Sequence, residues 1–103
     1  MSVRVQSTES YLQEKMFRLR QRLWEDYGAN PKQLGGVIEY LTLDKEKGLT
    51  AYASQLHKEW HTLGDRAAQL VAYVQVPEGK REKAVELVKD YMTCFVSVVQ
   101  PGD

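Results

Sequence analysis

The sequence has few of the features that mark an exported, membrane-bound or disulfide-stabilised protein. It holds a single cysteine, Cys94, so no disulfide can form within the chain. It has no run of about 18 apolar residues, which excludes a predicted membrane-spanning helix. Residues 1–8 lack the apolar stretch of a signal peptide. We therefore expect a cytoplasmic protein that does not enter a membrane.

An excess of charge of one sign is also lacking. The chain has 14 basic and 14 acidic residues and a formal net charge of zero at pH 7. There is thus no overall field to attract nucleic acid or anionic lipid, and an electrostatic partner would have to recognise a local patch. The apolar share of 43% is that of a globular protein. A chain of 103 residues fits a single domain, which we expect to span residues 1–103.

Proline is scarce as well, and its three positions leave two long stretches for helices. The first helix is predicted from Ser7 or Thr8 to Tyr27, with Gly28 as its stop. A second, shorter helix is predicted to start at Asn30, which caps it, with Pro31 in its first turn and Gln33 completing a capping box. The apolar faces of these two helices are predicted at Leu12, Met16, Leu19, Leu23 and Tyr27, and at Leu34, Val37, Ile38 and Leu41.

The third predicted helix is long and runs from Leu49 or Thr50 to Val76, since apolar residues recur there every three or four positions. It would measure roughly 42 Å at about 1.5 Å per residue. A compact domain of this size has a radius of gyration of only about 13 Å. The helix must therefore kink at Gly64 or extend beyond its own domain, where a second copy would cover it.

A fourth helix is predicted from about Glu78 to Val96, and the fold is then an all-α bundle of about four helices. The β-branched residues near the C-terminal end leave one alternative open. In that α+β alternative, Leu70–Val76 and Met92–Gln100 are strands around a helix.

The chain offers little chemistry at a recognisable spacing. His57 and His61 lie four residues apart, which on a helix would place both imidazoles on one side. Asp65 is too far along the axis to join them, so we predict no metal site. The neighbours of Cys94 are mostly apolar, which favours an inert thiol over a nucleophile. We predict no cofactor and no enzymatic activity.

Two surfaces of the first helix are candidates for contact. Lys15, Arg18 and Arg22 form a basic row that suits an anion or an acidic partner, or else is simply solvated. Phe17 and Trp24 lie seven residues apart, well outside the apolar stripe. Either this helix is buried between two others, or its second apolar side meets a partner.

From these surfaces we expect a small non-enzymatic interaction protein, such as an adaptor, a chaperone or an inhibitor of another protein. A homodimer is the predicted assembly, and the predicted interface residues are Phe17, Trp24, Tyr27 and Trp60. Two alternatives remain. The basic row could bind nucleic acid, or arginines and carboxylates from separate helices could form a small enzyme site.

Overall fold

The computed structural model describes residues 8–37 and 48–99, and within these ranges the chain is helical with no strand. The all-α prediction is confirmed, and the alternative with strands at 70–76 and 92–99 is wrong. The second helix, α2, ends at Leu34, well before its predicted apolar face does, and the predicted positions of Ile38 and Leu41 lie outside the described residues. The helices are α1 (Thr8–Tyr27), α2 (Pro31–Leu34), α4 (Gly48–Lys58), the 3-10 helix η1 (Trp60–Thr62), α5 (Leu63–Tyr73), the 3-10 helix η2 (Glu78–Lys80) and α6 (Arg81–Val99).

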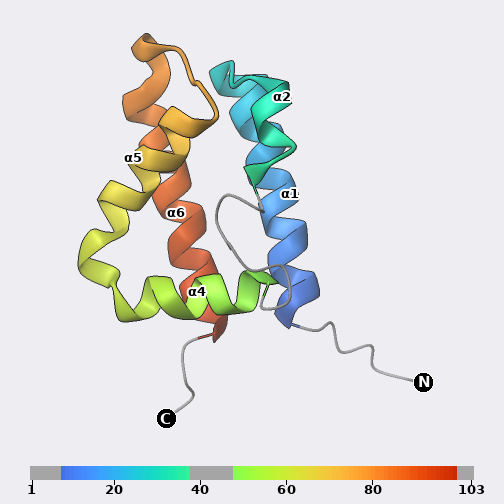
Figure 1. Ribbon diagram of the computed structural model, residues 1–103, viewed down its shortest axis with the longest axis vertical. Helices are drawn as coiled ribbons and strands as arrows, with labels where there is room; N and C mark the ends of the chain where they lie inside the picture. Colours follow the sequence, from blue (N-terminus) through green and yellow to red (C-terminus); the bar gives the residue numbers. More distant parts are fainter. Residues whose placement is uncertain (1–7, 38–47, 100–103) are drawn as a thin grey trace.

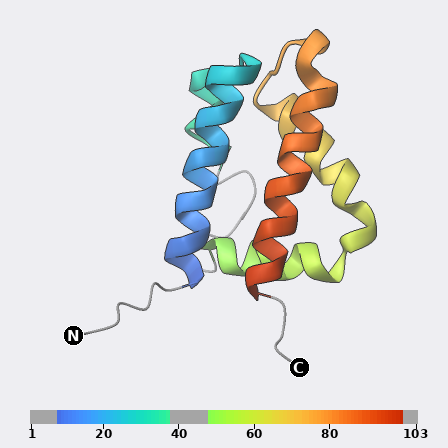
Figure 2. The ribbon, with the colours of Figure 1, turned by 180° about the vertical axis from the view of Figure 1, so that it is seen from behind.

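Helices α1 and α6 lie side by side and run in opposite directions (Figures 1 and 2). Helix α5 packs along α6, and α4 crosses the end of the bundle where α1 begins and α6 ends (Figure 1). The short α2 sits at the opposite end of α1 (Figure 1). No helix in the described ranges is long and apolar enough to cross a membrane.

Helix α1 has the predicted bounds, and its sequence explains both its buried face and its end. Gly28 follows the last helical residue with a φ of 72°, a conformation that glycine adopts without strain. The amide of Gly28 donates to the carbonyl of Trp24 at 3.2 Å, and the amide of Ala29 donates to that of Leu23 at 2.9 Å. These bonds satisfy carbonyl groups that the end of a helix would leave unpaired.

Asn30 caps α2 as predicted, but the capping box predicted with Gln33 does not form, because the amide of Asn30 donates to another carbonyl. The Asn30 side-chain oxygen accepts from the amide of Lys32 at 3.0 Å. Asn30 also connects this end of the bundle to the turn after α5. Its amide donates to the carbonyl of Val74 at 2.8 Å, and its side-chain nitrogen donates to the side-chain oxygen of Gln75 at 2.8 Å.

The long third helix is not continuous, and this part of the prediction is wrong. The chain turns a corner between α4 and α5, where Glu59 leaves the helical conformation with a φ of −113° and a ψ of 43°. The Thr62 hydroxyl donates to the Glu59 carbonyl at 2.8 Å, and Arg66 pairs with the Glu59 carboxylate at 2.7 Å. These polar groups fix the corner at Glu59–Thr62 instead of at Gly64. Both α4 and α5 can then pack on α6 (Figure 2).

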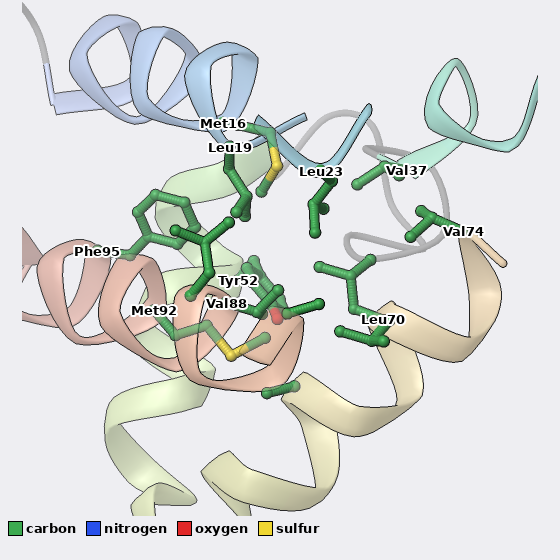
Figure 3. Packing of buried hydrophobic residues seen from close by; sticks show 14 of the residues in the cluster. Met16, Leu19, Leu23, Val37, Tyr52, Leu70, Val74, Val88, Met92 and Phe95 are labelled. Atoms are coloured by element: carbon green, nitrogen blue, oxygen red, sulfur yellow. The ribbon is translucent and has the colours of Figure 1, made fainter. Parts of the chain in front are cut away.

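The corner removes one of the two reasons for a homodimer, because α4 and α5 both pack on α6 in place of one long helix that would extend beyond the domain. The apolar stripe stays in phase on both sides of the corner, so Leu56 of α4 and Leu63 of α5 are both buried. Side chains from every long helix converge in one core (Figure 3). The labelled members are Met16, Leu19, Leu23, Val37, Tyr52, Leu70, Val74, Val88, Met92 and Phe95.

A carboxylate from the first turn of α1 caps α4, and we refer to this arrangement as the Glu9 clasp. Glu9 accepts from the amide of Leu49 at 2.9 Å, and from the amide and the hydroxyl of Thr50, each at 2.8 Å. Partial burial opposes ionisation of Glu9, but its hydrogen bonds outweigh that effect and lower the pKa of the carboxyl. The clasp thus joins the start of α1 to the start of α4, which lie some 40 residues apart in the sequence.

Candidate functional site

The two aromatic side chains outside the α1 stripe are exposed. Phe17 is 58% exposed and Trp24 is 53% exposed, although the stripe residues beside them, such as Leu23, are fully buried. A helix enclosed between two others would bury both rings, so that interpretation of the sequence is wrong. One side of α1 packs on the core and the other presents two large rings to solvent.

These rings border a hollow of about 350 Å³ between α1 and α2, which we call the aromatic groove. Its volume falls in the range of sites that hold a small ligand or a few side chains of a partner. Helix α1 contributes one wall and α2 the other, at the end of the bundle where α2 packs (Figure 1). The lining residues are Phe17, Arg20, Gln21, Trp24, Pro31, Leu34 and Gly35.

Most of the lining is apolar, and Arg20 is its only ionisable member among the described residues. The Nε atom of Arg20 is buried and has no hydrogen-bond partner there. No ion pair joins its guanidinium to any residue in the described ranges. An acceptor from outside the chain could supply the hydrogen bond that this buried Nε atom lacks.

The predicted basic row differs from Arg20 because its charges are already engaged. Lys15 lies over the ring of Tyr11, with its Nζ atom 5.4 Å from the ring centre. Arg18 pairs with Glu14 at 3.5 Å, and Arg22 pairs with Asp26 at 3.4 Å, both one helical turn apart. The basic row therefore lies outside the aromatic groove. Its three cations each have a partner within the chain.

Arg22 is directed toward α6. A hydrogen bond with the Tyr91 side chain, assisted by the Asp26 carboxylate, raises the pKa of its guanidinium. This end of the basic row thus contributes to the contact between α1 and α6. The nucleic-acid alternative stays a prediction.

A second hollow of about 380 Å³ lies at the corner between α4 and α5, and we call it the corner hollow. Its rim includes Trp60, which is 46% exposed. His57 also lines it, in the last turn of α4, but His61 belongs to η1 beyond the end of that helix. The premise that both histidines share one continuous helix is therefore wrong. The other lining residues are Thr93, Val96 and Ser97 of α6.

The remaining candidates lie away from the groove. Tyr27 is partly buried and packs against the core. Cys94 is partly buried on α6, and its sulfur lies 3.5 Å from the Tyr11 hydroxyl. That hydrogen bond is the main reason why the pKa of Tyr11 is raised. The contact joins α1 to α6.

Sequence reasoning found the two rings but missed the rest of the groove. Arg20 follows Phe17 by three residues and precedes Trp24 by four, a spacing that places it on the same side of α1. This spacing is visible in the sequence. The contribution of Pro31, Leu34 and Gly35 could not be read from the sequence, because it depends on how α2 folds back along α1.

Comparison of the chain with protein-family models, with curated protein sequences and with solved structures found no match. The candidate function therefore depends on the geometry of the site alone.

Proposed function

We propose that this chain is a non-enzymatic protein-interaction module and that the aromatic groove is its contact surface. The observation that supports the proposal is the exposure of Phe17 and Trp24 beside a hollow with a mostly apolar lining. Large aromatic side chains around a pocket are the usual anchors of protein interfaces. Among the described residues, one ionisable side chain in the lining suits binding better than acid–base chemistry.

The magnitude of the apolar exposure supports the same conclusion. Large aromatic side chains bury about 150–250 Å² each, so the exposed halves of the two rings amount to about 200 Å² of apolar surface. At about 25 cal/mol per Å², covering them would contribute about 5 kcal/mol before the costs of association. That is a large fraction of the stability of a small domain. A partner that covers both rings would therefore bind with a strong apolar contribution.

The homodimer stays a prediction, but with less support than the sequence alone provided. The continuous third helix was one of its two reasons, and the corner at Glu59–Thr62 removes it. Only the exposed rings remain, and they suit any partner with a complementary surface. The proposal is accordingly an interaction with another protein through the groove.

The experiment is an affinity capture from cell extract with matched surface variants. Wild-type protein, Trp24→Ala, Phe17→Ala and Glu82→Ala are immobilised at equal density, after thermal melts have shown that each is folded. A partner that uses the groove is recovered by wild-type protein and by Glu82→Ala, and is lost with both aromatic variants. The recovered protein must then bind in purified form with the same order of affinities. Equal recovery by all four proteins would refute the groove as the contact surface.

A further inference from the structure

The unpaired charge in the aromatic groove indicates what kind of partner fits it. Arg20 lines the groove together with Phe17 and Trp24, and its guanidinium has no acidic partner in the described ranges. By contrast, Arg18 and Arg22 on the other side of the same helix each have a carboxylate one turn away. Within the described residues, Arg18 and Arg22 therefore have acidic partners and the arginine of the groove has none.

The surroundings of Arg20 make its charge available to a ligand. Its Nε atom is already withdrawn from solvent, so part of the desolvation cost of an ion pair has been met in the free protein. The apolar walls lower the local dielectric and strengthen a charge contact compared with one in water. Guanidinium groups bind carboxylates in a planar, two-bonded geometry that Lys does not offer.

We propose that the aromatic groove binds a short acidic segment of another protein. A large apolar side chain of that segment fills the groove between Phe17 and Trp24, and an Asp or Glu about one helical turn away pairs with Arg20. Amphipathic helices commonly occupy apolar grooves in this way. This inference rests on the proposed function and adds the chemistry of the partner to it.

A second copy of this chain fits the groove less well. A two-fold axis makes the same patch meet itself. Such a dimer would bring a second Arg20 to the interface in place of a carboxylate. Two unpaired cations would then lie at the same apolar interface. Charge complementarity thus favours an acidic segment of another protein over self-association.

The test is selection of displayed random peptides of about 12 residues, enough for three helical turns. Peptides are selected on the wild-type protein and depleted on Trp24→Ala, so that survivors depend on the groove. We expect survivors to share a large apolar residue with an Asp or Glu within four positions. One survivor is then synthesised, together with a version in which its acidic residue is changed to the amide.

The synthetic pair shows whether Arg20 recognises the acid. Arg20→Met should weaken binding of the acidic peptide about tenfold, the usual loss when a charged hydrogen-bonded partner is removed. Arg18→Met is the matched control, because it removes an arginine from the same helix outside the groove, and it should change affinity less than about twofold. The amide version of the peptide should bind wild-type protein and Arg20→Met equally well. Arg20→Lys keeps the charge and should retain part of the preference, which separates loss of charge from loss of folding.

The possible outcomes separate this inference from the proposed function. Survivors without an acidic residue, or affinities unaffected by Arg20→Met, would refute the acidic segment and leave the groove as a contact surface. Two results together would refute both the groove as a contact surface and the acidic segment. No selected peptide would depend on Trp24, and the aromatic variants would capture the same proteins as the wild-type protein. Sedimentation equilibrium gives the third outcome. The wild-type protein could have twice the 11.9 kDa mass of one chain, and Trp24→Ala the mass of one chain. That result would assign the groove to a second copy and refute the acidic segment.

Discussion

Helix α1 carries two polar arrangements that differ in one respect, the Glu9 clasp at its start and Arg20 in the aromatic groove. Glu9 accepts three hydrogen bonds from the first turn of α4. Arg20 has no acceptor within the described parts of the chain. A charge whose bonds are all satisfied internally stabilises the fold, whereas an unpaired charge next to exposed rings is available for a ligand. Stability and binding should therefore depend on different residues of the same helix.

The largest loss of stability is expected for Gly48→Ala. Gly48 has a φ of 65°, and a Cβ atom there would lie 2.7 Å from a carboxylate oxygen of Glu9. The substitution adds strain of about 1–2 kcal/mol for a residue with a side chain in the left-handed region. It also displaces the Glu9 carboxylate from α4. Chemical denaturation at pH 7 should show a total loss of about 3–4 kcal/mol.

The double variant Glu9→Ala, Gly48→Ala tests whether displacement of the Glu9 carboxylate contributes to this loss. With the carboxylate absent, Gly48→Ala should cost only the backbone strain, so the two losses should not add. Fully additive losses would show that the close approach to Glu9 plays no part.

Removing the clasp itself should have the next largest effect. Glu9→Ala leaves the first amides of α4 without their acceptor, and loss of a cap of this kind costs about 0.5–2 kcal/mol. The clasp also links two helices, so we expect a value near 2 kcal/mol in urea denaturation. Glu82→Ala is the control, because Glu82 is exposed on α6, and it should change stability by less than about 0.5 kcal/mol. If Glu9→Ala and Glu82→Ala lost the same free energy of unfolding, the clasp would not contribute to stability.

The sequence allowed some of these features to be predicted and concealed others for physical reasons. The bounds of α1 and the cap of α2 follow from local signals, namely an apolar stripe, a glycine stop and an Asn-Pro start. The Glu9 clasp joins residues some 40 positions apart, so no local pattern announces it. The corner at Glu59 could not be predicted, because the apolar stripe keeps its phase across it. Apolar periodicity indicates which residues are buried, but it does not show whether the helix is continuous.

Acid should weaken the clasp specifically. The pKa of Glu9 is lower in the folded protein than its ordinary value of 4.5, so its carboxylate contributes stability above that pH. This contribution is lost as the pH falls through the folded-state pKa. The stability difference between wild-type protein and Glu9→Gln should therefore be full at pH 6 and shrink steadily below about pH 4.5. Urea denaturation at a series of pH values measures it, and a difference independent of pH would contradict the ionised clasp.

The smallest effect on stability is expected in the groove, although binding depends on it most. Trp24 is 53% exposed, so Trp24→Ala removes only part of the ring's surface from the folded interior and should lower the free energy of unfolding by about 1 kcal/mol, less than Glu9→Ala. Alanine also has the higher helix propensity, which offsets part of any lost packing. Chemical denaturation of Trp24→Ala beside Glu9→Ala makes the comparison direct, since both changes lie on α1. A loss near 2 kcal/mol for Trp24→Ala would mean that the ring is needed for the fold. The groove would then be part of the core, and its aromatic side chains would no longer indicate a partner.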